Sequence, residues 1–381
     1  MTITLGAFRV TDAIRVAVNT VLDSGRLSYG PATRHYEERF ANMHGCSYGV
    51  ASNSGTSSLV VALQALKELH GWADGDEVLL PAITFVASAN AIVHNRLTPV
   101  LVDVDPVTYN INPWLIDDAI TRRTRCIMPV HLFGQPANMS VISRIARKHN
   151  LRIIEDSCET MLATWNGRPA GTWGDVACFS TYTAHLLVTG VGGMATTNDN
   201  RLAQLMRSLV NHGIDLTELP NGEQYDPSFL ARKFRFTRIG HSFRVTEIEA
   251  AIGLAQLKDL PAMIEKRRQN AQHLISRLQP IKHRVMLPHT HQAATHSWMV
   301  FPVVLNEGSK WPVMEYLQKH GIECREMMPL TNQPCYGFNE KAYPVAAHVN
   351  KCGLYLPVHQ DLTTEQLDYM ADTLMGWFND N

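Results

Sequence analysis

The segment from residue 179 to residue 199, FSTYTAHLLVTGVGGMATTND, places a side chain that can transfer protons between two expected strands. The first strand ends at Ser180, the chain passes through His185, and the second strand begins after Gly192 and Gly193. The unperturbed pKa of an imidazole is about 6.5, so His185 can take up or release a proton near neutral pH. His185 is therefore the first candidate for a catalytic residue.

A second segment, SNSGTSS at 52–58, is suited to binding a phosphate group, and Gly55 and Thr56 lie at its centre. It follows an expected strand and opens an expected helix, so hydroxyls and backbone N–H groups meet at the positive end of the helix dipole. An ordinary Ser/Thr N-cap explains the same residues equally well. This segment alone leaves both interpretations open.

Asp156 ends the apolar run RIIED and is the third candidate. A carboxylate at such a strand end can accept a hydrogen bond from a protonated pyridine nitrogen and so keep the ring an electron sink. The alternative is that EDSCE at 155–159 is an N-cap followed by acidic residues in the first turn of a helix.

Short apolar runs rich in β-branched residues alternate with segments of helical period in the first half of the chain. The expected strands cover 48–52, 77–82, 99–105, 125–130, 152–157, 175–180 and 193–197, and the expected helices include 56–70, 84–95 and 138–149. This alternation predicts an α/β fold with a mainly parallel seven-stranded sheet flanked by helices. Ligands of such sheets bind beyond the carboxyl ends of the strands, where the three candidates lie.

The pattern changes after residue 245, and we expect three parts: a large α/β domain at 1–245, a linking helix at 246–280 and a small α+β domain at 281–381. Pro261 marks a kink or a break in the linking helix. The small domain should contain a strand at 296–305, a helix that ends at Gly321 and a terminal helix. The polar loop at 214–230 is expected to be mobile or ordered only by a partner.

The charge balance excludes several classes of partner. Lys and Arg number 34 against 35 Asp and Glu, which gives a formal net charge of −1 and no field that would attract nucleic acid. The N-terminus lacks a basic region followed by an apolar one, and no apolar run approaches the roughly 20 residues that span a bilayer. We expect a cytoplasmic protein without a membrane or nucleic-acid partner.

The seven cysteines are scattered and form no CxxC pair, which argues against a disulfide framework and against a zinc site. No metal is therefore expected. The one alternative is that Cys324, Cys335 and Cys352 meet in space, since sequence spacing alone does not exclude this.

Together these motifs resemble the nucleotide-sugar aminotransferases of the DegT family, which are fold type I pyridoxal-phosphate enzymes. The matches run in order from SGRLSYGP, which begins at residue 24, to YLPVHQDL, which ends at 362. They include PAITFVASANAI at 81–92, EDSCE at 155–159 and the strand-end serine before GGM. The resemblance implies a large domain that binds pyridoxal or pyridoxamine 5'-phosphate.

The resemblance also implies roles for individual residues. Gly55, Thr56 and Ser180 would hold the cofactor phosphate, and Phe85 would stack on the pyridine ring. Asp156 would bind the ring nitrogen. Glu159 stands where many members of the family have Gln, near the phenolic oxygen of the cofactor.

Further stretches also resemble the family, and one of them departs from the family pattern at a single residue. In GHSFRVTEIEAAIG at 240–253, Ser242 replaces an Asn that in the family reaches the cofactor phosphate of the neighbouring subunit, while Arg244 matches. The shared site implies a homodimer. His131 and His359 lie in family-like stretches and are interpreted as structural.

The family carries a lysine where this chain has His185, and no lysine occurs between Lys148 and Lys233. A lysine forms a Schiff base with pyridoxal phosphate, and an imidazole cannot. One interpretation is an aminotransferase homologue that lost its lysine and serves as a non-catalytic or regulatory protein that binds cofactor or sugar.

The other interpretation rests on the sugar 3-dehydratases of the same family, which carry His at this position and use pyridoxamine phosphate. The resemblance then implies a 3-dehydratase acting on a nucleotide-linked 4-keto-6-deoxyhexose, with His185 as base and glutamate restoring the cofactor. A reductase-coupled type holds an iron–sulfur cluster on a set that includes a Cys-x-Cys pair. This chain has no such pair, so the cluster-free type is expected.

Overall fold

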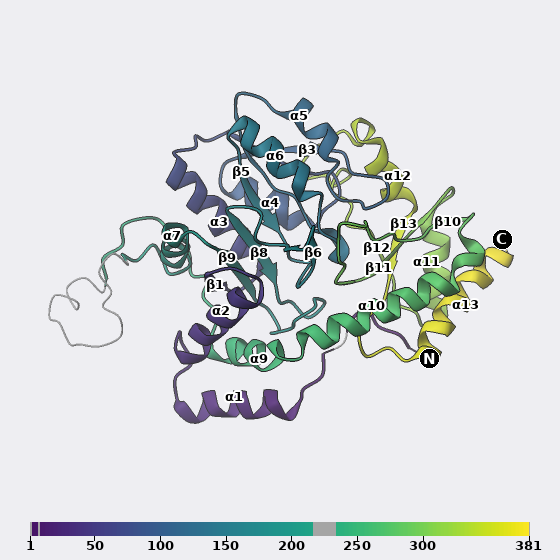
Figure 1. Cartoon of the computed structure of the whole chain (residues 1–381), viewed down its shortest axis with the longest axis horizontal. Helices are drawn as coiled ribbons and strands as arrows, with labels where there is room; N and C mark the ends of the chain where they lie inside the picture. Colours follow the sequence, from purple (N-terminus) through teal and green to yellow (C-terminus); the bar gives the residue numbers. More distant parts are fainter. Residues whose placement is uncertain (1, 7, 216–233, 381) are drawn as a thin grey trace.

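A seven-stranded sheet forms the centre of the larger part of the molecule (Figure 1). The computed structural model describes residues 2–6, 8–215 and 234–380. The strand order is β1-β9-β8-β5-β4-β2-β3. The bounds are β1 (Tyr48–Ser52), β2 (Glu77–Pro81), β3 (Thr98–Val102), β4 (Thr124–Ile127), β5 (Arg152–Asp156), β8 (Val176–Ser180) and β9 (Gly193–Thr197). Only β9 pairs antiparallel with its neighbours, β1 and β8, so the mainly parallel sheet expected from the sequence is confirmed.

Helices cover both faces of this sheet. They are α2 (Pro31–Met43), α3 (Gly55–His70), α4 (Val86–His94), α5 (Ile116–Ala119), α6 (Met139–His149) and α7 (Asn200–Val210). Helix α3 begins where the Ser54 hydroxyl accepts a hydrogen bond from the N–H of Ser57, and it ends at Gly71 in the left-handed conformation. Ten of its residues are buried, which fixes its first turn against the sheet.

Helices α1 (Asp12–Ser24) and α9 (Glu247–Leu257) lie together with α2 along one side of the sheet (Figure 1). The buried carboxylate of Glu247 accepts hydrogen bonds from the N–H groups of Gly30, Ala32 and Thr33 at 2.8–2.9 Å. It therefore caps α2, whose N-cap residue Gly30 has no side chain to do so. This contact holds α9 in a fixed position beside the sheet.

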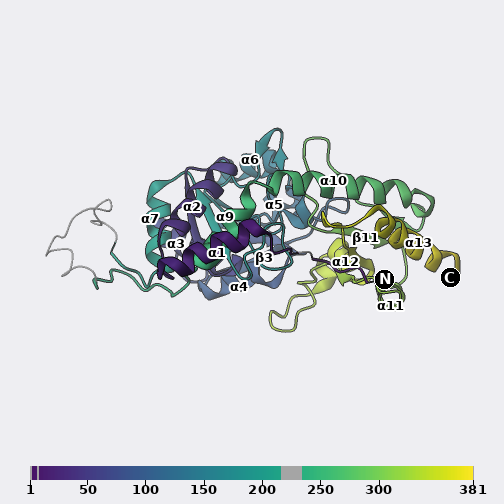
Figure 2. The ribbon, with the colours of Figure 1, turned by 90° about the horizontal axis from the view of Figure 1, so that it is seen from below.

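The stretch from 246 to 280 contains two helices rather than one. Helix α9 ends at Leu257, and α10 (Leu260–Arg277) begins with Pro261 in its first turn. The break before Pro261 follows because proline lacks the N–H that a continuous helix needs. Helix α10 then runs from the large sheet toward the C-terminal part of the molecule (Figure 2). The domain boundaries at 245 and 280 stay predictions.

A second, four-stranded antiparallel sheet has the order β10-β11-β13-β12. Its strands are β10 (Val285–Met286), β11 (Phe301–Leu305), β12 (Arg325–Glu326) and β13 (Gly353–Leu356), with α11 (Lys310–Lys319), α12 (Pro344–Cys352) and α13 (Thr364–Asp380) around it. The strand expected at 296–305 is shorter than predicted because Trp298 has a φ of 52°. The N-terminus joins this part through a bridge between Ile3 and Ile322.

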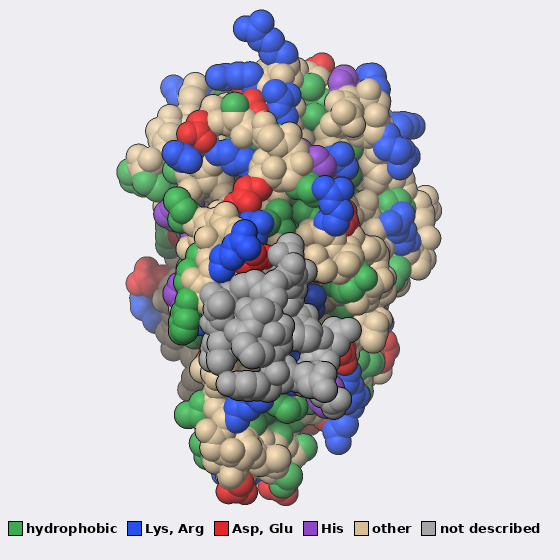
Figure 3. All heavy atoms as spheres, turned by 90° about the vertical axis from the view of Figure 1, so that its left-hand side faces the viewer, with side chains coloured by type: hydrophobic (Ala, Val, Ile, Leu, Met, Phe, Trp, Pro, Cys, Tyr) green, Lys and Arg blue, Asp and Glu red, His purple; other side chains and the backbone are tan. Residues whose placement is uncertain are grey.

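The surface and the remaining elements add little to the site. A two-stranded hairpin, β6 (Thr164–Trp165) and β7 (Arg168–Pro169), follows β5. Lys and Arg side chains predominate over Asp and Glu on the face that carries α7 (Figure 3). No helix within residues 2–6, 8–215 and 234–380 is long and apolar enough to cross a membrane. The polar loop expected at 214–230 falls mainly outside the described residues.

Candidate active site

The carboxyl ends of β1, β5 and β8 converge on the start of α3. Ser180 ends β8 and lies opposite Gly193 of β9, while Asp156 ends the neighbouring strand β5. A Cβ added to Gly55 would lie 2.8 Å from the Cβ of Ser180 and 2.9 Å from the Sγ of Cys158. Gly55 therefore allows the first turn of α3 to approach the strand ends more closely than any other residue would.

The start of α3 is both an N-cap and an open polar cradle. Ser54 is the N-cap residue, and the Ser57 hydroxyl donates to the side-chain oxygen of Asn53 at 2.7 Å. Thr56 is half-buried, and neither its hydroxyl nor the N–H groups of Gly55 and Thr56 have a hydrogen-bond partner within the described part of the chain. These free donors at the helix N-terminus suit an anion. The N-cap interpretation is therefore confirmed for Ser54, and a phosphate site at Gly55 and Thr56 stays a prediction.

Asp156 is held in one orientation. Only 4% of the residue is exposed, Oδ2 accepts a hydrogen bond from the Ser88 hydroxyl at 2.7 Å, and Oδ1 accepts one from the N–H of Cys158 at 3.2 Å. No helix begins after Asp156, because residues 157–163 form turns and bends. The alternative that EDSCE caps a helix is therefore wrong. A buried carboxylate with fixed oxygens can bind a cationic ring nitrogen.

Glu159 is buried three residues later, with one oxygen committed. Its Oε2 accepts a hydrogen bond from the N–H of Phe133 at 2.7 Å, and Phe133 has a left-handed φ of 57°. Burial raises the pKa of Glu159 to about 7, with a further increase from the nearby charge of Asp156 and an opposing effect from the Phe133 N–H. Glu159 can therefore carry a proton at neutral pH.

His185 lies on the connection between β8 and β9. The residue is half-buried, and its Nδ1 atom is buried without a hydrogen-bond partner among the described residues. Burial lowers the pKa of His185 to about 4, because desolvation disfavours the imidazolium, and this outweighs the opposing effect of the Cys158 main chain. The imidazole is thus neutral at pH 7, and no group in the described part of the chain forms a hydrogen bond with its Nδ1 atom.

Phe85 is placed at the edge of the same site. It immediately precedes α4, and 59% of its surface is exposed. Ser88, in the first turn of the same helix, contacts Asp156. The first turn of α4 therefore sets the position of Phe85 relative to the Asp156 carboxylate. Such exposure of a large aromatic side chain leaves an apolar face for a ligand.

Ser242 is not brought into this cluster by a side-chain contact. It is exposed, and its hydroxyl accepts a hydrogen bond from Arg244 at 2.9 Å, while Arg244 also donates to the side-chain oxygen of Asn211. The main chain passes beside the cradle, since the carbonyl of Phe243 accepts a hydrogen bond from the N–H of Asn53 at 2.7 Å. Ser242 thus borders the site and faces outward.

The other histidines considered from the sequence have structural contacts. His131 Nδ1 accepts the N–H of Ala137 at 3.1 Å, so Nε2 carries the proton and donates it to the fully buried Glu155 at 2.9 Å. His359 contacts the carbonyl of Thr4 at 3.1 Å. All seven cysteines are free. Within the described residues, no three His, Cys, Asp or Glu side chains are placed to hold a metal ion.

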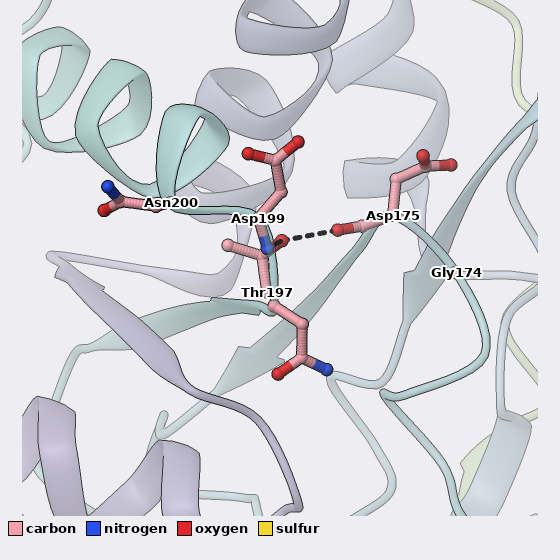
Figure 4. Close-up of a pocket in the computed structure, with 6 residues that line it drawn as sticks. Gly174, Asp175, Thr197, Asp199 and Asn200 are labelled. Atoms are coloured by element: carbon pink, nitrogen blue, oxygen red, sulfur yellow. Dashed lines mark hydrogen bonds between the residues drawn. The ribbon is translucent and has the colours of Figure 1, made fainter.

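Sequence reasoning missed Ser88 as a site residue. Its position three residues after Phe85, on the first turn of a helix, was the available signal, but the pairing with Asp156 joins residues 68 positions apart. A separate pocket lies at the opposite end of β8, lined by residues 174–175 and 197–200 (Figure 4). There the Thr197 hydroxyl donates to the carbonyl of Asp175 at 2.7 Å. That pocket contains none of the candidate residues.

The comparison with protein families matches residues 9–375 to the DegT/DnrJ/EryC1/StrS aminotransferase family. The chain belongs to this family, as the sequence motifs predicted, and its fold is that of a fold type I pyridoxal-phosphate enzyme.

Individual relatives differ in activity. The chain is 37% identical over 352 residues to a GDP-perosamine synthase of Caulobacter vibrioides, covering 91% of this chain and 90% of the relative. It is 29% identical over 380 residues to a GDP-4-keto-6-deoxy-D-mannose 3-dehydratase of Escherichia coli, covering 94% and 95%. A solved structure of an Escherichia coli GDP-4-keto-6-deoxy-D-mannose 3-dehydratase, with bound hydrated pyridoxal phosphate, is similar to this chain with a TM-score of 0.90. The two are 28% identical, and the match covers 98% of this chain and 100% of that chain.

Proposed function

We propose that this protein is a pyridoxamine-phosphate-dependent nucleotide-sugar 3-dehydratase that acts on a nucleotide-linked 4-keto-6-deoxyhexose. The observation that carries the proposal is His185. It stands where the family carries lysine, and the main chain of Cys158, between Asp156 and Glu159, lies close enough to its ring to affect its pKa. A neutral imidazole can accept a proton but cannot attach the cofactor covalently.

The residues present fit pyridoxamine or pyridoxal phosphate. The free donors of Gly55 and Thr56, with Ser180 beside them, would hold the phosphate. The fixed carboxylate of Asp156 would bind the ring nitrogen, and Phe85 would cover the ring. Glu159, with one oxygen free of the Phe133 N–H, would face the phenolic oxygen.

When bound, pyridoxamine phosphate supplies an amine for the sugar ketone and a ring that withdraws electrons. His185 would take a proton on its imidazole and return it to the departing C3 hydroxyl as water forms. The net reaction removes the C3 oxygen of the sugar. Glutamate would restore the amine that is lost as ammonia and would leave as 2-oxoglutarate.

A homodimer that shares the site is part of the proposal. Apolar residues around the candidate site remain exposed in the single chain: Phe85 is 59% exposed, Tyr182 51% and Val191 55%. A second copy of the chain would cover such a surface. Ser242, which borders the cradle and faces outward, would then be available to the cofactor phosphate of the partner.

A second candidate function is that of a protein that binds the cofactor or the sugar without turnover. The higher identity to a GDP-perosamine synthase favours this candidate, since a homologue of that enzyme without its lysine would lose transamination. The two candidates differ in one property. Only the dehydratase releases the C3 oxygen from its sugar.

Two measurements distinguish these candidates. Purified protein with pyridoxal phosphate and glutamate should form pyridoxamine phosphate and 2-oxoglutarate. Addition of GDP-4-keto-6-deoxymannose should then give a product lighter by the C3 oxygen and should return the cofactor to pyridoxal phosphate. Cofactor binding without either conversion would favour the non-catalytic candidate, and formation of a 4-amino sugar would contradict the dehydratase.

A further inference from the structure

The connection that carries His185 is closed at its base by two threonines. We define the His185 loop as residues 181–192. The N–H of Thr181 donates to the carbonyl of Gly192 at 2.9 Å, and the N–H of Thr189 donates to the carbonyl of Thr181 at 2.9 Å. The two threonine hydroxyls also bond to each other at 2.7 Å. Both side chains are buried, so water does not compete for this pair.

Gly192 makes room for the hydroxyl pair. A Cβ at Gly192 would lie 2.4 Å from the Oγ1 of Thr181 and 2.5 Å from the Oγ1 of Thr189. The two hydroxyls therefore occupy the space that any other residue at 192 would need. This close packing fixes the separation of the two ends of the His185 loop.

A second contact ties the loop to α9. The side-chain oxygen of Gln256 accepts a hydrogen bond from the N–H of Val188 at 3.3 Å, and its nitrogen donates to the carbonyl of Val188 at 2.6 Å. The amide group of Gln256 thus bonds to both the N–H and the carbonyl of Val188, as the main chain of a neighbouring β-strand would. Helix α9 is itself held beside the sheet by Glu247, which caps α2.

The imidazole of His185 has few contacts of its own. The Cys158 main chain interacts with it, but its Nδ1 atom has no hydrogen-bond partner within the described residues. Its main-chain N–H bonds within the loop, to the carbonyl of Tyr182 at 2.9 Å. A lysine at this position would be held by its covalent bond to the cofactor. With His185, the position of the reactive nitrogen depends on the frame of the loop, and misplacement by ~1 Å can cost about a hundredfold in rate.

We propose that Thr181, Thr189 and Gln256 are positioning residues, which hold His185 toward the cofactor site by closing the loop and fastening it to α9. This inference rests on the proposed function for the role of His185. In enzymes with lysine at this position, the covalent bond to the cofactor holds the side chain in place. Here, three residues distant from the reacting atoms would hold His185 in place.

A covalent reporter tests the position of residue 185 without reference to dehydration. In the variant His185→Lys, the lysine amine should attach to pyridoxal phosphate and be trapped by borohydride, and mass spectrometry gives the trapping rate. Adding Thr189→Val or Gln256→Ala to this background should slow trapping by about tenfold, because the amine is displaced from its attack position. Adding Thr189→Ser, which keeps the hydroxyl, should leave the rate within about twofold.

A matched control separates positioning from general loss of a buried hydroxyl. Thr196 of β9 is fully buried, and its hydroxyl has no hydrogen-bond partner. Adding Thr196→Val to the lysine background should leave the trapping rate unchanged. Melting temperatures of all variants identify any that do not fold, and Gln256→Ala keeps the test valid if Thr189→Val is unstable.

The outcomes distinguish this inference from the proposed function. In the protein with His185, Thr189→Val should lower kcat for dehydration by about tenfold with little change in KM. Slowed trapping in a protein that does not dehydrate sugar would support the positioning role and contradict the dehydratase. Equal trapping rates for Thr189→Val and Thr196→Val would overturn the positioning role, whether or not the protein dehydrates sugar.

Discussion

The imidazole of His185 has a low proton affinity, and its Nδ1 atom lacks a hydrogen-bond partner within the described residues. Burial lowers its pKa to about 4 in the protein without ligands, so the neutral imidazole predominates at neutral pH. A base with so low a pKa is always available but accepts a proton less readily than one matched to the operating pH. Any approaching anion, such as a phosphate, would raise this pKa toward neutrality.

The first prediction concerns His185 as the base. The variant His185→Asn should lower the dehydration rate by about 10²–10⁴-fold, because proton transfer to a positioned side chain is lost. Cofactor affinity, measured by fluorescence titration with pyridoxamine phosphate, should change little, since no covalent bond is removed. A variant that retains dehydration within about tenfold would show that another group is the base.

The second prediction concerns the pH dependence of stability at Glu159. Its pKa is raised from 4.5 to about 7, so between these values the folded protein binds more protons than the unfolded chain, and stability falls as pH rises. The variant Glu159→Gln removes this term. Relative to the unaltered protein, the variant should therefore gain about 2–3 kcal/mol of unfolding free energy as the pH rises from ~4.5 to ~8.

Chemical denaturation of the cofactor-free protein checks this prediction. The control is Glu265→Gln, because the side chain of Glu265 is 56% exposed and its change should alter the pH profile little. His185 acts in the opposite direction below its ordinary pKa of 6.5, since its lowered pKa removes stability as pH falls. Comparing the variant with the unaltered protein cancels that contribution. A difference that does not change with pH would contradict the raised pKa of Glu159.

At the scale of elements, the site depends on how closely α3 approaches the ends of β8 and β9. Gly55 lies against Ser180 and Cys158, and a Cβ on Gly193 would lie only 2.2 Å from the carbonyl oxygen of Ser54. The donors at the start of α3 therefore lie next to the strand ends only because both glycines lack side chains. The phosphate cradle is a product of this contact rather than of α3 alone.

The third prediction tests this contact. The variant Gly55→Ala should displace the first turn of α3, lower stability by about 1–3 kcal/mol and weaken cofactor binding. The control is Gly376→Ala in α13, where the added Cβ would meet only the Tyr316 hydroxyl oxygen at 3.7 Å. That change should be neutral or stabilising by up to about 1 kcal/mol. Thermal unfolding and cofactor titration measure both effects, and equal behaviour of the two variants would contradict a tight α3 contact.

At the scale of the whole molecule, the proposed homodimer would cover the exposed apolar residues around the site. Phe85 precedes α4, whereas Tyr182 and Val191 lie near the two ends of the His185 loop, and all three are exposed. A site left open to water on this side would weaken every electrostatic contact within it. Covering the site with a partner would exclude that water.

The fourth prediction is that light scattering during gel filtration gives twice the chain mass of 42.6 kDa. The variant Val191→Arg should dissociate this dimer and lower cofactor retention, because a charge would enter an apolar contact. The control is Val107→Arg, since Val107 is also exposed, at 40%, but lies beyond β3 at the edge of the sheet. A monomer that retains cofactor fully would contradict the shared site.

The sequence by itself determined the strands of the large sheet and named the candidate reactive residues. Alternating runs predicted all seven strands of the large sheet to within a few residues, since period and composition are local properties of a chain. Parallel strands then place Asp156 and Ser180 at one edge. The replacement of lysine by His185 is also legible from sequence, because it changes the available chemistry whatever the packing.

Only the tertiary structure decided how these residues are held. The bond from Ser88 to Asp156, the contact of Gln256 with Val188 and the approach of Gly55 to Cys158 join residues that are far apart in the chain. No local pattern encodes such pairs, because they depend on how helices settle on the sheet. Burial likewise sets the pKa of His185 and Glu159, and burial is a property of the folded molecule rather than of the residue.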